Sequence, residues 1–164
     1  MNKTDLQKWI EYHQWRVDKI CQNLQQVDSL SFLQPIKGSF SSLSHLVGHA
    51  VSAEHIWLVR MNNQADKFPK YEYFENIHIA KTTWQQVTQR FIQKLQNLND
   101  EELSGTFSYY TNSGKLITNA YQDVLLHIFD HSTYHIGQIA WIIRSFGITP
   151  ISTNYIFYLR EKQN

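Results

Sequence analysis

The chain has few of the residues that build disulfide frameworks and loop-rich folds, with one cysteine, three prolines and six glycines among 164 residues. A lone cysteine excludes an internal disulfide, and we interpret Cys21 as a small buried apolar residue. No apolar run reaches the roughly 18 residues of a membrane span. The N-terminal segment MNKTDLQKW lacks the apolar core of a signal peptide. From these absences we expect a cytoplasmic protein without a membrane anchor.

The chain also has almost no excess of one charge over the other. Fifteen basic and fourteen acidic residues give a net charge of +1, and they form no basic stripe or acidic block. Neither nucleic acid nor a membrane surface is therefore an expected partner. Apolar residues make up 42% of the chain and aromatic residues 14%, which is enough to bury a core at this length. We expect a single domain over residues 1–164.

Four long segments show the apolar periodicity of amphipathic helices. They are residues 4–27, 40–61, 83–98 and 119–146. The expected helix caps are Thr4, Thr83 in a capping box with Gln86, and Asn119, with Gly147 as the left-handed residue that ends the last helix. Four such helices in a small domain predict an all-α fold, an antiparallel four-helix bundle.

The segments between these helices predict smaller elements. Residues 62–81, which contain Pro69 and have no clean periodicity, are expected to form a loop with a short helical turn. Residues 106–110 and 115–118 flank a turn and predict a small hairpin. Residues 153–162 predict a short accessory helix.

Three histidines recur every fourth residue in the segment HIFDHSTYHIGQ. On a helical wheel, neighbouring rings are about 40° apart. The apolar stripe places His135 at the centre of the buried face, His131 just inside it and His127 at its edge. Burying an unpartnered ring is costly, and neutral imidazole is the commonest metal ligand. We therefore predict that His131 and His135 bind a metal ion; the alternative is a pair of core histidines with tyrosine, asparagine or backbone partners.

A third ligand is predicted from the second long segment, which carries His45 and His49 four residues apart. His49 borders the apolar stripe, whereas His45 is turned toward solvent. Metal sites in helix bundles are assembled from side chains on facing helices, so we choose His49. Three imidazoles with an open fourth position are typical of catalytic zinc sites. His13 is interpreted as a structural or pocket-wall residue, and His55 as structural or exposed.

Several motifs resemble the DinB family of damage-inducible, metal-binding four-helix proteins, and the resemblance covers nearly the whole chain. They are YHQW in the first helix, HAVSAEHIW in the second, and HSTYHIGQ followed by IIRSFGITPISTNYIFYLR. The resemblance implies a metal held by His49, His131 and His135, with Glu54 as the acidic residue five positions after the first ligand. It also implies a homodimer, which the many aromatic residues favour.

Relatives within the wider superfamily are thiol-dependent transferases and isomerases. The resemblance therefore implies a metal-dependent enzyme that acts on a small thiol or electrophile, as a hydrolase or a thiol transferase, with His127, Tyr134 or Glu54 assisting proton transfer. The alternative is a metal-binding stress protein without turnover. A cavity beside the site would favour the enzyme, and a closed site the alternative.

The identity of the metal is open at this point. Zinc or nickel is our first expectation, and manganese and iron are alternatives, because three imidazoles suit several divalent ions. Protons compete for the same lone pairs, so we expect metal affinity to fall as the pH drops through roughly 6.5.

Overall fold

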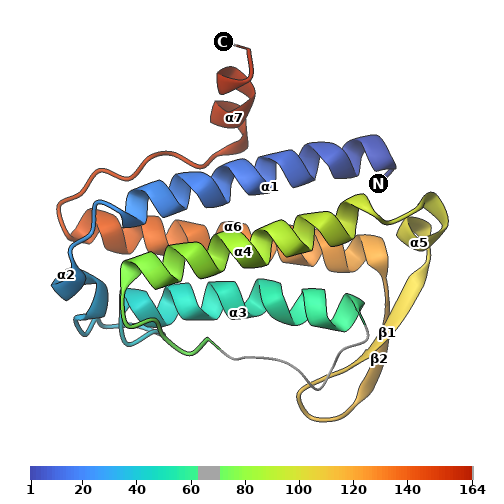
Figure 1. Cartoon of the computed structure of the whole chain (residues 1–164), viewed down its shortest axis with the longest axis horizontal. Helices are drawn as coiled ribbons and strands as arrows, with labels where there is room; N and C mark the ends of the chain where they lie inside the picture. Colours follow the sequence, from blue (N-terminus) through green and yellow to red (C-terminus); the bar gives the residue numbers. More distant parts are fainter. Residues whose placement is uncertain (63–70, 164) are drawn as a thin grey trace.

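The structure is a computed structural model that describes residues 1–62 and 71–163. Its framework consists of four long helices, α1 (Lys3–Leu24), α3 (Leu43–Met61), α4 (Ile77–Gln96) and α6 (Tyr121–Ser145). The described part also contains the short helices α2 (Ser29–Leu33), α5 (Asp100–Ser104) and α7 (Tyr155–Glu161), and the strands β1 (Thr106–Tyr110) and β2 (Leu116–Ala120). The predicted bundle with short accessory helices and a hairpin is confirmed (Figure 1).

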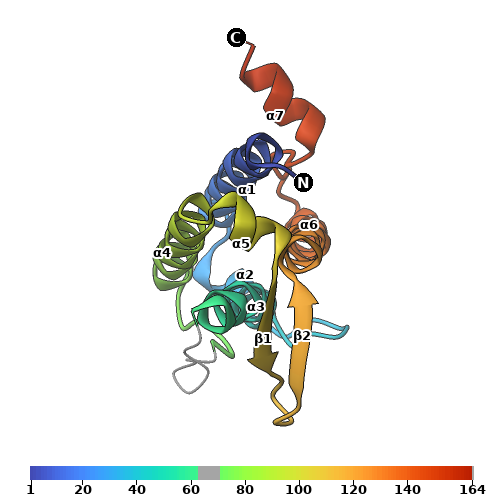
Figure 2. The same ribbon diagram turned by 90° about the vertical axis from the view of Figure 1, so that its right-hand side faces the viewer.

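The four long helices surround a common axis when seen end on (Figure 2). Helices α1 and α3 occupy opposite corners, and each of them contacts both α4 and α6. Helices α1 and α6 run in one direction, and α3 and α4 run in the other (Figure 1). Helix α3 and helix α6 are therefore antiparallel neighbours, as a metal site shared between them requires.

The core consists of two apolar clusters along the bundle. One lies toward α2 and includes Val17, Ile20, Leu46 and Ile139. The other lies toward α5 and includes Leu6, Leu58, Phe91 and Leu125. Each cluster draws side chains from all four long helices, so burial of apolar surface stabilises their packing along its length.

A buried polar layer contains His13, Arg16 and Glu54. The Arg16 guanidinium, 1% exposed, donates to His13 Nδ1 at 2.8 Å and to Thr133 Oγ1 at 2.6 Å. His13 therefore carries its proton on Nε2, which donates to Glu54 Oε1 at 3.1 Å. The other carboxylate oxygen accepts from Trp84 Nε1 at 3.3 Å. These bonds join α1 to α3, α4 and α6, and the structural role predicted for His13 is confirmed.

Two of the predicted helix starts are wrong because the capping residue lies earlier than the apolar stripe indicates. Helix α1 is capped by Asn2, whose side chain forms a capping box with Asp5, and not by Thr4. Helix α4 begins six residues before Thr83, because the Asn76 side chain accepts from the Ile79 amide and starts the helix there. Thr83 therefore lies within α4.

The starts of α3 and α6 also differ from the prediction. Helix α3 is capped by Ser42, which accepts from the His45 amide, so Phe40 precedes the helix. Asn119 lies in β2, where its side chain accepts from the Tyr109 hydroxyl at 3.0 Å, and it does not cap α6. The end of α6 is as predicted, because Gly147 has a φ of 81°.

The loop predicted over residues 62–81 is only partly described. Residues 63–70, which include Pro69, lie outside the described residues. Residues 71–76 are irregular, and residues 77–81 belong to α4, so the predicted loop is too long at its end. The hairpin is confirmed: β1 and β2 pair antiparallel, with Ser108 opposite Thr118.

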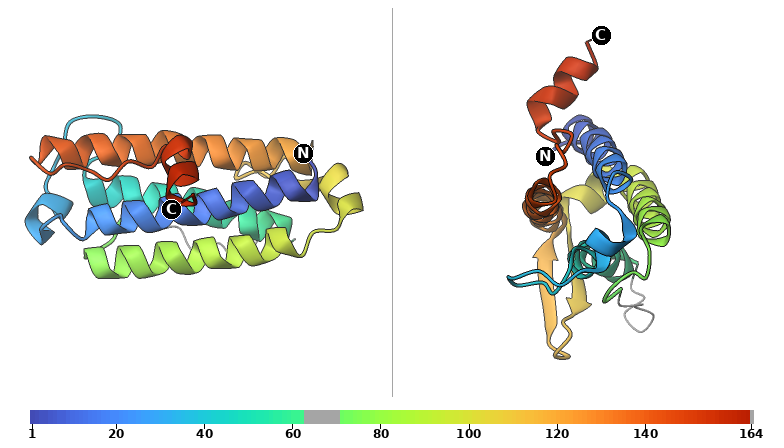
Figure 3. Two further views of the ribbon diagram at one scale, coloured as in Figure 1. Left: turned by 90° about the horizontal axis from the view of Figure 1, so that it is seen from above. Right: turned by 90° about the vertical axis from the view of Figure 1, so that its left-hand side faces the viewer.

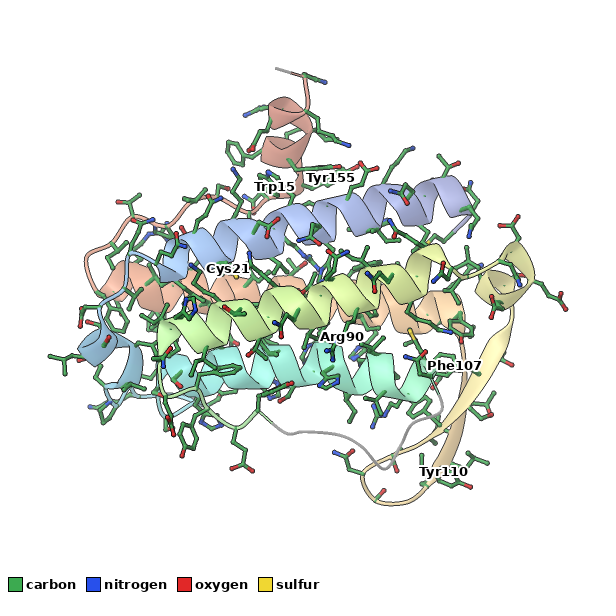
Figure 4. The ribbon with its side chains drawn as sticks, viewed as in Figure 1. Trp15, Cys21, Arg90, Phe107, Tyr110 and Tyr155 are labelled. Atoms are coloured by element: carbon green, nitrogen blue, oxygen red, sulfur yellow. The ribbon has the colours of Figure 1, made fainter. Side chains whose placement is uncertain are left out.

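Helix α7 stands out from the bundle beside α1 (Figure 3). It rests on aromatic side chains of α1, and Trp15 and Tyr155 lie between the two helices (Figure 4). The Tyr12 and Tyr155 ring centroids are 4.9 Å apart, and the Tyr158 hydroxyl donates to Glu11 Oε2 at 3.1 Å. Within the described ranges, none of the helices combines the length and hydropathy that crossing a membrane requires.

Candidate metal centre

Three imidazoles converge between α3 and α6. His49 comes from α3, and His131 and His135 come from successive turns of α6. One nitrogen of each ring lies within 4.8 Å of the other two. His131 Nε2 is 3.1 Å from His135 Nε2, and the His49 and His135 ring centroids are 4.6 Å apart. The structure therefore brings together the three predicted ligands, and their binding of a metal stays a prediction.

The cluster extends from the core to the surface. His135 is 4% exposed, His131 is half-buried and His49 is exposed. This order follows from their positions, because His135 lies on the buried stripe of α6 and His49 lies at the edge of the stripe of α3. The inner side of the cluster is packed, and its outer side faces solvent.

Gln138 fixes the orientation of the most buried ring. It lies three residues after His135 on α6, and its Oε1 accepts from His135 Nδ1 at 2.8 Å. A proton held on Nδ1 leaves the lone pair on Nε2, the nitrogen that faces His131. Metal-binding histidines commonly have such a partner on their second nitrogen, because it sets the tautomer and the ring plane.

The surroundings favour the neutral form of all three rings. Burial lowers the pKa of His131 to about 4, with further lowering by the neighbouring His135, His127 and His49. Burial also lowers the pKa of His135 and of His49. Neutral rings have free lone pairs at pH 7, and metal binding requires the deprotonated ligand.

The residues present fit a divalent transition-metal ion. Four ligands at zinc distances of about 2.0–2.1 Å lie about 3.4 Å from one another in a tetrahedron. The separation of 3.1 Å between His131 Nε2 and His135 Nε2 is close to this value. A set of three imidazole nitrogens suits zinc, nickel, copper and iron, whereas calcium and magnesium prefer oxygen ligands.

The outer side of the cluster opens into a hollow of about 370 Å³. The Arg60 guanidinium is placed at this hollow by stacking 4.7 Å from both the Trp57 and Tyr109 ring centroids. Its walls mix polar and apolar side chains, and they include His45, His49, Ser52, Ile56, Arg60, Tyr71, Glu72 and Asn112. A ligand there would contact the exposed member of the three-histidine cluster directly.

The other sides of the cluster are more closed. The Phe40 ring centroid is 5.1 Å from that of His49 and 5.8 Å from that of His135, so this side chain covers one side. Toward the core, a gap of about 10 Å³ borders Glu54, His131 and His135. This volume is at most enough for one water molecule.

The three candidates for proton transfer lie in different surroundings. His127 is exposed, with its ring centroid 5.5 Å from that of His131. Tyr134 is also exposed, and its ring lies 5.1 Å from that of His135. Glu54 is buried, and both of its oxygens accept hydrogen bonds in the polar layer. His127 and Tyr134 thus have the more accessible positions, and the catalytic role of each stays a prediction.

The remaining histidines and the cysteine lie outside the cluster. His45 is half-buried, and its Nδ1 lies 3.1 Å from the Ser41 hydroxyl. The prediction that His45 is turned further toward solvent than His49 is therefore wrong, because His49 is the exposed one of the two. His55 is buried and stacks on Tyr71, as a structural residue would. Cys21 is buried, and burial raises the pKa of its thiol to about 12, which argues against a nucleophilic role.

Two residues of this site were not predicted from the sequence. Gln138 could have been identified from its spacing, because a residue three positions after a ligand on a helix is a neighbour of that ligand. Phe40 gave no such signal, because it comes from the irregular segment before α3 and reaches the cluster only through the tertiary fold.

Comparisons with known proteins agree in one family. A family model described as the DinB family matches residues 1–164. Protein DinB of Bacillus subtilis (strain 168) is 23% identical over 160 residues, with 93% of this chain and 92% of that protein covered. The uncharacterized protein YizA of the same organism is 22% identical over 152 residues, with 92% and 94% covered.

A solved structure supports the fold. The crystal structure of a DinB-like protein from Bacillus cereus ATCC 10987 has a TM-score of 0.70 to this chain. The two are 17% identical, and the match covers 88% of this chain and 94% of that chain. At this identity the likeness bears on the fold alone.

Proposed function

The chain belongs to the DinB family, and from that premise we propose a metal-dependent enzyme whose divalent ion is held by His49, His131 and His135. The observation that carries the proposal is the convergence of one nitrogen from each ring to within 4.8 Å. Two further features support it: burial favours the neutral form of the rings, and Gln138 orients His135.

The hollow at His49 favours an enzyme over a stress protein without turnover. Three protein ligands leave a coordination position for substrate or water, whereas structural zinc sites usually have four protein ligands. The hollow of about 370 Å³ begins at the most exposed ligand. A non-catalytic metal site would gain nothing from such an opening.

We propose a small thiol or electrophile as the substrate, and thiol transfer or hydrolysis as the reaction. A bound ion would lower the pKa of a water or thiol, so that hydroxide or thiolate is available near neutral pH. The cationic Arg60 would hold an anionic group of the substrate in the hollow. His127 and Tyr134, at the rim of the cluster, are the groups we propose for proton transfer.

Zinc or nickel is the proposed metal, with manganese and iron as alternatives. Imidazole ligands bind zinc and nickel more tightly than manganese or iron. The test is elemental analysis of full-length protein purified without a nickel column. We expect stoichiometric metal in the parent and in His45→Ala, and loss of most metal from His131→Ala and His135→Ala with helical content retained. Full metal occupancy in either of the last two variants would refute the site.

Turnover is tested separately with the metal-loaded protein, a small thiol and chlorodinitrobenzene. In this reaction the thiolate sulfur forms a bond to the ring carbon, chloride leaves, and the thiol proton passes to the buffer. We expect faster conjugation with the parent than with His135→Ala. Stoichiometric metal without turnover of any thiol or ester offered would favour the stress-protein alternative.

We also propose a homodimer. Large apolar side chains remain exposed on two helices, and such surfaces commonly mark interfaces. They include Leu126 on α6 and Ile156 and Phe157 on α7. Sedimentation equilibrium that shows only a 19.4 kDa species at micromolar concentration would contradict a dimer. The cytoplasmic location and the absence of nucleic acid partners stay predictions.

A further inference from the structure

A second hollow, of about 350 Å³, lies between the segment before α3 and the outer face of α6. Pockets that bind small molecules commonly have volumes of about 300–1,000 Å³. Its walls are mainly apolar and include Ile36, Phe40, Leu46, Tyr134, Trp141 and Ile142. This hollow is separate from the hollow at His49, and the role proposed above does not use it.

Two large aromatic side chains of α6 line this hollow while remaining open to solvent. Trp141 is 65% exposed and Tyr134 is 63% exposed. They are seven residues apart, so they lie on the same face of the helix. Together with Phe40 they offer three flat apolar surfaces, which suit stacked or edge-to-face contacts with an aromatic ring.

The hollow has one charged side chain among its described lining residues, Lys37. Lys37 forms no ion pair with any other described residue. A single ammonium group beside apolar walls suits a monoanion such as a carboxylate. A phosphate would call for several charged donors, such as paired arginines.

The hollow shares two walls with the three-histidine cluster. Phe40 packs on the His49 and His135 rings, and Gln138 lines the hollow while accepting from His135 Nδ1. A ligand in this hollow would therefore lie beside the candidate metal centre and not at a remote surface.

Gly137 leaves room for such a ligand. It lies in α6 and lines the hollow, and a Cβ atom added to it would meet nothing within 4 Å. Glycine within a helix costs about 0.5–1 kcal/mol relative to alanine. Gly137 therefore lowers the stability of α6 at the position where the hollow has free space.

We propose that this hollow binds a small aromatic carboxylate, with its ring between Phe40 and Trp141 and its carboxylate at Lys37. Its role as the substrate pocket rests on the proposed function; the binding itself does not require a metal.

The test is calorimetric titration of the full chain, with and without metal, using phenylacetate and its neutral amide, phenylacetamide. We expect saturable binding of phenylacetate and weaker binding of the amide. Lys37→Gln should weaken phenylacetate binding about fivefold, the range of an exposed charge pair, and should remove the preference over the amide. Lys115→Gln, in the hairpin turn, is the matched control and should bind like the parent.

Filling the hollow gives a second, independent variant. Gly137→Leu should weaken phenylacetate roughly tenfold or more, because its side chain occupies the space, and leucine is a better helix former than glycine, so the fold is retained. Gly137→Ala adds one methyl group and should leave binding close to the parent. Metal content is also measured in Lys37→Gln, Lys115→Gln, Gly137→Leu and Gly137→Ala. If it is unchanged, weaker phenylacetate binding reports on the hollow and not on the metal centre.

Three results would overturn the proposal. They are no saturable binding of phenylacetate by the parent, equal binding of the acid and the amide, and full binding by Gly137→Leu. Binding of phenylacetate by a protein that never takes up metal would support the pocket and contradict the proposed function, so the two failures are distinguishable.

Discussion

At the scale of single residues, the candidate centre depends on which nitrogen of each ring is free. His135 is held with its proton on Nδ1 by Gln138, so its Nε2 lone pair faces His131 at 3.1 Å. Without a metal, His131 Nε2 carries a proton and donates to His135 Nε2. With a metal, both lone pairs are directed at the ion, and the bond to Gln138 is retained in either state.

This geometry predicts that Gln138 controls metal affinity without touching the metal. Gln138→Leu should weaken metal binding about 10-fold to 100-fold, the usual effect of removing the partner of a metal-binding histidine. Gln138→Glu retains an acceptor oxygen and should bind close to the parent. The measurement is competition with a chromophoric chelator at pH 7.5. Equal affinities for Gln138→Leu and the parent would show that ring orientation is set by packing alone.

The lowered pKa values change the pH dependence expected from the sequence. Proton competition was expected near pH 6.5, but the pKa of His131 in the folded protein is about 4. Between these values the unfolded chain binds a proton at His131 that the folded chain does not bind. Folding is therefore opposed by acid, and stability rises with pH across this window.

The second prediction follows from this sign. The urea midpoint of metal-free protein should fall as the pH drops from 6.5 toward 4, and His131→Ala should lose part of this dependence. Some should remain, because burial also lowers the pKa of His13. The midpoint is measured at several pH values with chelator present. A dependence as steep in His131→Ala as in the parent would contradict the assigned pKa.

At the scale of elements, periodicity predicted which segments are helices but not where they begin. The stripe of α4 starts at Ala80 and continues through Trp84, both buried, so the pattern reveals only the turns that face the core. The first turn is fixed by Asn76, through a hydrogen bond that apolar periodicity does not contain. The start of α1 could not be predicted for the same reason, because it is set by the Asn2 capping box and not by the apolar stripe.

The shared face of His131 and His135 could be predicted, because it depends only on the geometry of one helix. The meeting of His49 with them also depends on which helices are neighbours and on their register, so it followed from the predicted bundle and the family resemblance and not from a single helix. The contribution of Phe40 could not be predicted, because it depends on how the segment before α3 folds over α6.

One close contact between elements gives the third prediction. A Cβ on Gly48 would lie 2.7 Å from the Tyr71 carbonyl oxygen and 2.9 Å from that of Glu72. This segment is held on α3 by hydrogen bonds from Ser44 and Ser52, so the backbone oxygens have little freedom to move. This contact could not be predicted from the sequence, because a glycine within a helical stripe indicates only a weak helix former.

Gly48→Ala should therefore destabilise the protein by about 1–3 kcal/mol. Gly137→Ala, on α6 with open space around it, is the matched control and should stabilise by about 0.4–1 kcal/mol. Both are measured by urea denaturation. Stabilisation of similar size in both variants would show that the segment at residues 71–74 yields to the added methyl group.

At the scale of the whole molecule, a polar layer lies between two apolar clusters. Arg16 and Glu54 carry opposite charges and are joined through neutral His13. The sequence predicts Glu54 as a candidate for proton transfer. In the structure both of its carboxylate oxygens accept hydrogen bonds within this layer. Only the arrangement of the four long helices around one axis brings these residues together, so no pattern within a single segment could reveal the layer.

The last prediction tests whether these two charges stabilise each other. Arg16→Met leaves the buried Glu54 carboxylate without its compensating charge and should cost about 3–5 kcal/mol of stability. Adding Glu54→Gln removes the uncompensated charge, so the double variant should be more stable than Arg16→Met alone. Recovery should be partial, because an amide nitrogen then faces the donor of His13 or Trp84. Urea denaturation of the four proteins at pH 7.5 gives the coupling energy. A double variant less stable than Arg16→Met would mean that Glu54 stabilises the bundle independently of Arg16, and that the layer acts through hydrogen bonds rather than through paired charges.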